Sequence, residues 1–320
     1  MTRRRISRRS VPANGFRQAF EHLAAAQAIL GRYRGVVGVA VGFERKRGSL
    51  RPGKAAYVVH VSRKRDPRTS RERLPDDLFG VPIDIVQRGA AGPRFSSGCF
   101  AAPAANTNEY GHLGLIAKDP SGTTVGLTVG HVAVPGAYPL TASVVSQPSV
   151  VDCWNLDDDP EKGGSLVEAH FAPTQDIALI ALAPADPSKI DPRLDGKVNA
   201  GVPRPITSLL SPPLPVQLVI PGLTTWPQGR LTEVGHSGRF DTKSEFGDDT
   251  FSGLCTFEFP ALDEIEPGWS GSLICDLANR PLALLSFGAV VRPDANSAPT
   301  PTVWAWPISP HYSFWRLGPA

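Results

Sequence analysis

The sequence lacks several features that define large classes of protein. It has no run of about eighteen apolar residues, which excludes a helix that spans a membrane. Its four cysteines, Cys99, Cys153, Cys255 and Cys275, are too few and too scattered for a disulfide scaffold, although a single Cys255–Cys275 bridge stays open. They form no CxxC pair, and no His/Cys cluster has zinc spacing. The basic start, Met1–Arg9, is not followed by the apolar segment of a signal peptide. We therefore expect a cytoplasmic protein with mostly reduced cysteines.

Charge is distributed unevenly along the 320 residues. Residues 1–95 contain 21 Lys and Arg against seven Asp and Glu, a balance of +14, whereas residues 96–320 contain 12 against 23, a balance of −11. The difference predicts two domains, 1–95 and 96–320. A basic surplus suits nucleic acid or acidic lipid, but no nucleic-acid motif accompanies it, so we do not expect a nucleic-acid partner. Docking of residues 1–95 on the rest of the chain, or on a partner protein, is the plainer expectation.

The first part has the pattern of a small α+β module behind a disordered basic arm, residues 1–12. Apolar residues at helical spacing predict a helix over 14–32, with Asn14 as its cap and Gly31 as its stop. Two β-branched runs predict a hairpin. The expected strands are 35–43, 55–62 and 81–87, with a short helix over 70–79.

The second part, residues 96–320, has a different sequence pattern: its 225 residues contain short apolar runs separated by turn-forming residues. The whole chain contains 31 Gly and 32 Pro, which argues against long helices. The spacing predicts an all-β sandwich or a pair of barrels, with an irregular linker over 203–215. The expected strands are 112–117, 124–129, 165–170, 176–182, 216–220, 253–259, 272–275, 282–291 and 302–308.

Three strings in this part carry side chains suited to nucleophilic catalysis. His131 follows a buried strand in Gly-Leu-Thr-Val-Gly-His, and Asp176 opens the apolar run Asp-Ile-Ala-Leu-Ile-Ala-Leu. Ser270 sits in Gly268-Trp-Ser-Gly-Ser, a glycine-flanked turn before a strand. A serine hydroxyl needs a base, an imidazole needs a carboxylate to orient it, and the oxyanion needs two N–H donors, here those of Gly268 and Ser270.

Each string alone is a weak signal, and each residue has an alternative interpretation with a purely structural role. His131 is equally compatible with a buried core histidine, Asp176 with a turn residue and Ser270 with a strand start. Rivals exist: Ser237 lies in another Gly-x-Ser-Gly string, and Asp157–Asp159 lie in a polar loop. The order His, Asp, Ser strengthens the combination, because the lipase-like and subtilisin-like layouts have other orders.

The three strings resemble those of the chymotrypsin/trypsin-like serine proteases, over roughly residues 97–318. Leu285-Ser-Phe-Gly288 resembles the Ser-Trp-Gly edge strand of that family, so Ser286, Phe287 and Gly288 are expected to bind substrate. The resemblance implies a mainly β fold, a chymotrypsin-like double β-barrel of two six-stranded barrels, preceded here by the α+β module. It also implies an endopeptidase of the bacterial, intracellular type, acting on protein or peptide substrates with no metal or cofactor.

Two departures from the family pattern matter. Trp269 replaces the Asp that pairs with a new N-terminus in secreted trypsins, so that activation switch is expected to be absent. Ser272 replaces the second glycine of the nucleophile loop, a milder change.

Three questions stay open at this point. The fold is compatible with a catalytically silent scaffold that works through its basic module, and the same site is compatible with an esterase. Acidic residues Asp263, Glu264 and Glu266 suit either a basic substrate side chain or, by preference, a solvated loop. Self-processing at Arg63-Lys-Arg65 or Arg71-Glu-Arg73 is a further hypothesis.

Overall fold

The computed structural model describes most of the chain outside several loops. The described residues are 14–46, 49–62, 73–88, 92–93, 102–103, 111–134, 150–154, 160–182, 202–206, 213–220, 223, 225–244, 247–266, 268–292 and 297–319. Within these ranges no helix is long and apolar enough to cross a membrane. The expected arm 1–12 and the expected rivals Asp157–Asp159 lie outside the described residues.

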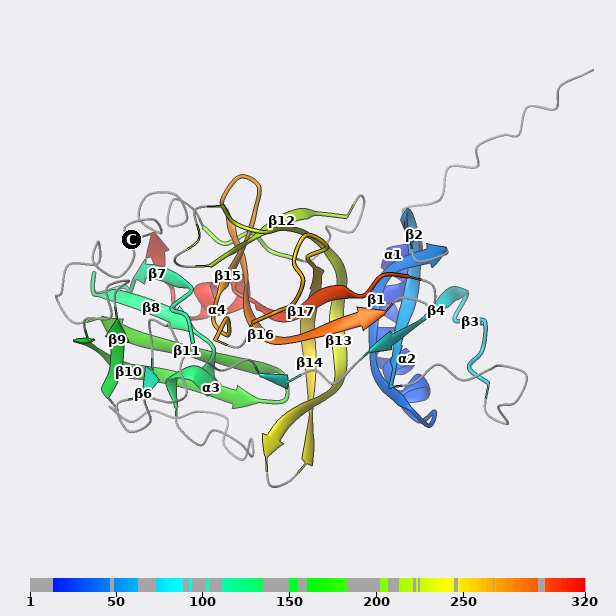
Figure 1. The fold of residues 1–320 in the computed structure, drawn as a ribbon, viewed down its shortest axis with the longest axis horizontal. Helices are drawn as coiled ribbons and strands as arrows, with labels where there is room; N and C mark the ends of the chain where they lie inside the picture. Colours follow the sequence, from blue (N-terminus) through cyan, green and yellow to red (C-terminus); the bar gives the residue numbers. More distant parts are fainter. Residues whose placement is uncertain are drawn as a thin grey trace, which may run out of the picture.

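The chain is mainly β, and the predicted fold class is confirmed (Figure 1). The helices are α1 (Asn14–Glu21), α2 (Leu23–Leu30), α3 (Gly130–Ala133) and α4 (Ser309–Phe314). The strands are β1 (Val36–Lys46), β2 (Ser49–Val61), β3 (Asp77–Leu78), β4 (Val81–Arg88), β5 (Gly92–Pro93), β6 (Ala102–Pro103), β7 (Leu115–Lys118), β8 (Thr124–Thr128), β9 (Val150–Trp154), β10 (Pro160–Ala172), β11 (Gln175–Leu182), β12 (Pro215–Val219), β13 (Gln228–Ser244), β14 (Gly247–Glu258), β15 (Leu273–Asp276), β16 (Pro281–Arg292), β17 (Thr300–Pro307) and β18 (Gly318–Pro319).

Six strands of the second part close into a barrel. Their order is β12-β15-β16-β17-β14-β13, and a further pairing of β12 with β13 closes the ring. Closure leaves these strands with few free edges and gives them one inward face. Alternate residues of these strands fall into two hydrophobic clusters: Val303 and Ala305 of β17 belong to one, and Trp304 and Trp306 belong to the other, together with Phe240, Phe251 and Phe287.

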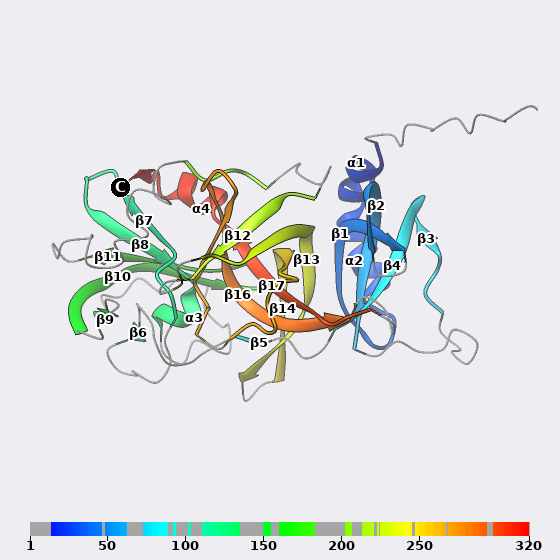
Figure 2. The same cartoon turned by 45° about the horizontal axis from the view of Figure 1, so that its top comes forward.

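The other large sheet carries the residues between the module and this barrel. Its order is β18-β7-β8-β11-β10-β9-β6, so the last strand of the chain pairs with β7 (Figure 2). The strand β11 is almost entirely buried, as expected for the apolar run that begins at Asp176. Residues of both sheets share one hydrophobic cluster, which places the two sheets face to face across a common core.

The N-terminal module is joined to the barrel by strand pairing. The hairpin β1–β2 forms as predicted, β4 pairs with β2 in parallel, and the helices α1 and α2 pack against β1 and β2. β1 then pairs with β13, and the end of β4 pairs with β16. The sheet therefore runs across the predicted boundary at residues 95/96, and the division into two domains stays a prediction.

Three local expectations need correction. The helix over 14–32 is interrupted at His22, where α1 gives way to α2, and it ends at Leu30 with Gly31 as its C-cap. The helix expected over 70–79 is wrong for its described residues, since 77–78 form β3 and 79–80 form a turn. The Cys255–Cys275 bridge is also absent, because both residues are free buried thiols.

The longest strand, β13, was not predicted at all. Its sequence, Gln-Gly-Arg-Leu-Thr-Glu-Val-Gly-His-Ser-Gly-Arg-Phe-Asp-Thr-Lys-Ser, is polar and rich in glycine. The pattern has no apolar run because β13 buries polar groups between the module and the barrel. One of its glycines, Gly238, and the facing Gly38 of β1 leave the room that the ring of His236 occupies.

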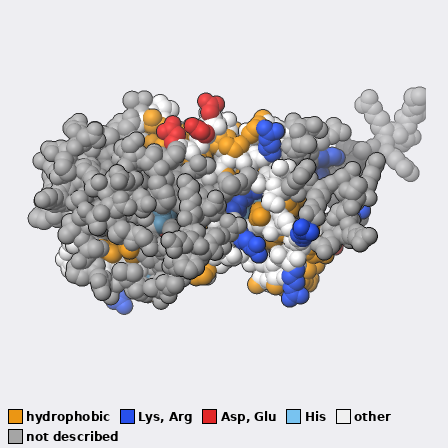
Figure 3. All heavy atoms as spheres, turned by 60° about the horizontal axis from the view of Figure 1, so that its bottom comes forward, with side chains coloured by type: hydrophobic (Ala, Val, Ile, Leu, Met, Phe, Trp, Pro, Cys, Tyr) orange, Lys and Arg blue, Asp and Glu red, His pale blue; other side chains and the backbone are white. Residues whose placement is uncertain are grey.

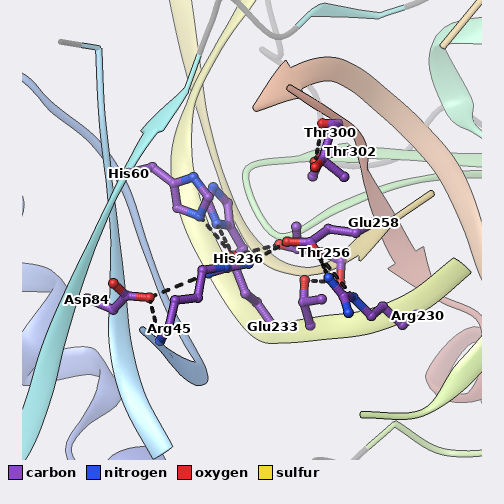
Figure 4. Close-up of polar contacts among 11 residues, drawn as sticks. Arg45, His60, Asp84, Arg230, Glu233, His236, Thr256, Glu258, Thr300 and Thr302 are labelled. Atoms are coloured by element: carbon purple, nitrogen blue, oxygen red, sulfur yellow. Dashed lines mark hydrogen bonds and ion pairs between the residues drawn. The ribbon is translucent and has the colours of Figure 1, made fainter. Parts of the chain in front are cut away.

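A buried network of charges holds the module against the barrel (Figure 4). Arg45 of β1 forms an ion pair with Glu258 of β14, and its guanidinium lies 3.6 Å from Asp84 and 4.0 Å from Glu233. Burial alone would lower the pKa of Arg45, but the three carboxylates raise that pKa above its usual value. The guanidinium therefore stays charged and neutralises acids that belong to both parts of the chain.

Arg88, at the end of β4, makes the second bridge of this interface. Its guanidinium lies 4.2 Å from the ring centre of Phe240 and 4.5 Å from that of Trp304. It also donates to the carbonyl oxygen of Arg239. On the face shown in Figure 3, most of the described Lys and Arg side chains lie in the right half, and the described Asp and Glu side chains lie together at the top. Two basic residues of the module, Arg45 and Arg88, therefore make contacts with the barrel inside the molecule.

We expect Arg45→Met to destabilise the protein by about 3–5 kcal/mol, because it removes a buried cation that faces Asp84, Glu233 and Glu258. Urea unfolding followed by tryptophan fluorescence measures the change. The control is Arg17→Met, which breaks an ion pair whose side chains are 82% and 55% exposed and should change stability little. Equal effects of the two substitutions on stability would contradict the stabilising role of the buried Arg45 cation.

Candidate active site

His131 and Asp176, the first two predicted site residues, are in direct contact. His131 lies in α3, the single turn that follows β8, and Asp176 lies at the start of β11, next to β8 in the sheet. Nδ1 of His131 is 2.6 Å from Oδ2 of Asp176, and the backbone N–H of His131 donates to Oδ1 at 3.0 Å. Both side chains are fully buried. Because the carboxylate accepts at Nδ1, the ring proton belongs on that nitrogen and the lone pair lies on Nε2.

Ser270 lies in the tight turn that the sequence predicts. The N–H of Ser272 donates to the carbonyl oxygen of Trp269 at 3.0 Å, and Gly268 and Gly271 adopt φ values of +94° and +86°. Only glycine accepts such values without strain, so the glycines on both sides allow the chain to reverse around Ser270. Trp269 is buried in the core of the barrel and anchors the turn.

Ser286 links the serine to the other two residues. The Ser270 hydroxyl donates to the carbonyl oxygen of Ser286 at 3.3 Å, and the Ser286 hydroxyl donates to Oδ2 of Asp176 at 3.0 Å. The ring of the next residue, Phe287, is stacked on His131 with centroids 6.3 Å apart. Residues that are far apart in the sequence therefore meet where β16 passes between the nucleophile turn and α3. The sequence predicts Ser286 as part of a substrate-binding edge strand, but it does not predict the contact between the Ser286 hydroxyl and Asp176.

The remaining candidates lie on the same elements. Phe287 and Gly288 continue β16, and Gly268 begins the turn that holds Ser270, which places the candidate oxyanion donors on that turn. The rival Ser237 lies within β13, paired with Val39 and Ser252, and not in a turn.

Sequence reasoning missed His112, which contacts the turn around Ser270 from the segment before β7. The N–H of His112 donates to the carbonyl oxygen of Ser270 at 2.6 Å, and its Nδ1 is hydrogen-bonded to the hydroxyl of Ser272. Its own carbonyl oxygen accepts from the hydroxyl of Thr128 at 2.7 Å. The signal in the sequence was slight: a histidine flanked by Gly111 and Leu113-Gly114, within a run expected only to be a strand.

Three side chains outside this site have the composition of a metal site. His60, Glu233 and His236 place ligand atoms within 4.8 Å of one another (Figure 4). Arg88 lies 3.2 Å from Nε2 of His236, and a guanidinium only donates, so Nε2 accepts and Nδ1 carries the proton toward Glu233. A metal on Nδ1 would need the opposite tautomer, which would set an N–H against an N–H. The donor set therefore fits an ion-paired network better than a metal.

Comparisons with known proteins give structural neighbours only. No family model matches the chain, and no curated protein matches its sequence. The structure is similar to the chymotrypsin of Cellulomonas bogoriensis, with a TM-score of 0.41 and 16% identity over 70% of this chain and 96% of that one. A Nocardiopsis protease gives 0.40 and 16% over 65% and 90%. A glutamic acid-specific serine protease gives 0.42 and 11% over 70% and 98%.

These neighbours are serine proteases of the class that the sequence resembles. The identities and TM-scores are too low to transfer any residue or activity to this chain. The roles of the site residues are therefore argued below from their own contacts.

We expect the free energy of unfolding to fall as the pH drops from about 6.5 toward 3. Burial lowers the pKa of His112 and of His236 to about 3, so both stay neutral in the folded chain while the unfolded chain takes up protons below pH 6.5. Each contributes a slope of up to about 1.4 kcal/mol per pH unit. Urea titrations between pH 7 and 4.5 measure the slope, which should shrink in His112→Asn and persist in the exposed-site variant His22→Asn. An unchanged slope in His112→Asn would show that burial of neutral His112 does not cause the pH dependence of stability.

We expect Gly114→Ala to disturb the nucleophile turn. A Cβ on Gly114 would overlap the backbone carbonyl oxygen of Gly271, which cannot move without shifting Ser270. Overpacking of this kind costs about 1–3 kcal/mol, visible in thermal unfolding. Gly15→Ala is the control, because its Cβ would meet only Ala55 at an ordinary 3.6 Å. Wild-type stability and site reactivity in Gly114→Ala would show that the close approach is unimportant.

Proposed function

We propose that this protein is a serine-type endopeptidase that hydrolyses peptide bonds through His131, Asp176 and Ser270. The observation that carries the proposal is the hydrogen-bonded chain from His131 to Asp176, from Asp176 to Ser286 and from Ser286 to Ser270. A buried carboxylate that orients an imidazole toward a serine hydroxyl is the arrangement that activates such a hydroxyl.

The first half of the reaction forms an acyl-enzyme. Oγ of Ser270 attacks the substrate carbonyl carbon, and Nε2 of His131 accepts the hydroxyl proton. Asp176 stabilises the imidazolium that results, because its carboxylate already accepts from Nδ1. The N–H groups of Gly268 and Ser270 hold the negative oxygen. His131 then gives its proton to the leaving nitrogen, and the C–N bond breaks.

The second half repeats the transfer with water. His131 removes a proton from a water molecule, whose oxygen attacks the ester carbonyl, and then returns the proton to Oγ of Ser270. The products are a free carboxylate and a regenerated serine. These reaction steps use no metal or cofactor.

The substrate backbone is proposed to lie along Ser286, Phe287 and Gly288. These residues belong to β16, and Ser286 touches the nucleophile. An extended peptide that adds itself to such a strand gains main-chain hydrogen bonds independent of its side chains.

Three finer expectations remain proposals. A cytoplasmic location accords with the free thiols of Cys255 and Cys275, whereas a bacterial origin rests on the sequence resemblance alone. A partner protein on the exposed basic residues of the module is a separate proposal. The acids Asp263, Glu264 and Glu266 are exposed, which supports the solvated-loop interpretation.

We expect a fluorophosphonate probe to label the wild-type protein at Ser270 and to leave Ser270→Ala unlabelled. Asp176→Asn should slow peptide hydrolysis by about 10⁴-fold, since the imidazole loses the acceptor that fixes its tautomer. Labelling is measured by mass spectrometry of the modified peptide.

The matched control is Ser237→Ala, which removes the serine of the other Gly-x-Ser-Gly string and should leave labelling unchanged. No labelling of the folded wild type would overturn the proposal in favour of a catalytically silent scaffold. Cleavage of activated esters without any cleavage of peptides would favour an esterase instead.

A further inference from the structure

Arg88, the last residue of the module strand β4, contacts the barrel through both its backbone and its side chain. The backbone pairs with Val291 of β16, the strand that also carries Ser286 and Phe287 (Figure 1). The guanidinium lies 4.2 Å from the ring centre of Phe240, a residue of β13. The module therefore reaches, at this one residue, the strand that passes the candidate nucleophile.

Phe240 connects this guanidinium to the candidate general base through one further ring. Phe240 and Phe287 are stacked, with centroids 4.3 Å apart and planes 26° apart. Phe287 is in turn stacked with His131, with centroids 6.3 Å apart and planes 24° apart. All four residues are buried. They form a continuous line of contacts from the module to the imidazole, which we call the aromatic row: Arg88, Phe240, Phe287 and His131.

The contacts of Arg88 fix the position of Phe240. A cation over the face of an aromatic ring is attracted by the negative face of that ring, and the attraction is stronger away from water. The guanidinium also donates to the carbonyl oxygen of Arg239, the residue before Phe240, and to Nε2 of His236 at 3.2 Å. On another side it lies 4.5 Å from the ring centre of Trp304. Arg88 therefore holds the backbone and the ring of β13 together at this point.

The His131 ring needs a neighbour on its face as well as a partner at its edge. The hydrogen bond from Nδ1 to Asp176, at 2.6 Å, fixes which nitrogen carries the proton. A bond at one ring nitrogen still allows the ring to tilt about that bond. The nearly parallel ring of Phe287 limits this tilt. The direction in which Nε2 points therefore depends on both the carboxylate and the aromatic row.

We propose that Arg88 is a positioning residue for His131, and that the N-terminal module is for this reason a working part of the candidate active site. This inference rests on the proposed endopeptidase function. Arg88 acts through other side chains: it holds Phe240 against Phe287, which limits the tilt of the imidazole. A misplaced base takes the hydroxyl proton of Ser270 less often, and small misplacements of this kind cost up to about 100-fold in rate.

Nitrogen-15 spectra of the histidine rings of the full chain test the position of the imidazole directly. In Arg88→Met the Nδ1–H signal of His131 should remain, because Asp176 still accepts it, but it should shift or broaden. Arg88→Lys keeps a cation and a donor, so its signal should lie nearer to the wild type than to Arg88→Met. The matched control is Arg230→Met, which removes an ion pair with Glu258 in the same joint and should leave the signal unchanged (Figure 4).

A double-mutant cycle tests whether Arg88 acts through Phe240. The rate at which the fluorophosphonate probe labels Ser270 should fall about 10- to 100-fold in Arg88→Met and by a similar factor in Phe240→Leu. The double variant should be no slower than the slower single variant, because both substitutions interrupt the same row. Arg230→Met should be labelled like the wild type. Circular dichroism establishes that each variant is folded.

The outcomes separate this inference from the proposed function. A wild-type protein that is not labelled overturns the endopeptidase, while the His131 signal still reports on the positioning role. An unchanged signal and labelling rate in Arg88→Met, or effects that multiply in the double variant, overturn the role of Arg88. If Arg88→Met does not fold, Phe240→Leu decides: labelling at the wild-type rate overturns the proposal.

Discussion

The site is organised by one buried carboxylate, that of Asp176. It accepts hydrogen bonds from the backbone N–H of His131, from Nδ1 of the same residue and from the hydroxyl of Ser286. A charge removed from water is tolerated only when its oxygens have such partners. Because the donors come from α3 and β16, the need to satisfy this charge fixes the place of the helix turn against the barrel. The imidazole tautomer and the position of the serine follow from it.

The turn that holds Ser270 is kept in place by close backbone contacts. His112 binds both Ser270 and Ser272 from the segment before β7, and glycines at 114 and 271 allow the chains to approach. The N-terminal module is held by two arginines: Arg45 pairs with Glu258 of the barrel, and Arg88 lies over the ring of Phe240. The same joint brings β5 to the edge of β16. The module and the barrel therefore share one continuous sheet.

The sequence predicted the parts of this arrangement that local patterns control. Apolar runs located most strands, glycine placement located the turn of Ser270, and the hairpin β1–β2 followed from β-branched residues. It failed where distant contacts decide the structure. β13 is a strand because its polar groups pair with Arg45, Arg88 and His60 of the module, and no pattern within β13 announces those partners. His112 was missed for the same reason, since its partners lie about 160 residues away.

Selective nitrogen-15 labelling of histidine rings tests the central claim about Asp176 most directly. If the carboxylate accepts from His131, proton spectra will show a far-downfield N–H signal that couples to Nδ1 of His131. That signal should persist in Ser270→Ala and disappear in Asp176→Asn. A His131 ring protonated at Nε2 alone, or a signal indifferent to Asp176→Asn, would contradict the account.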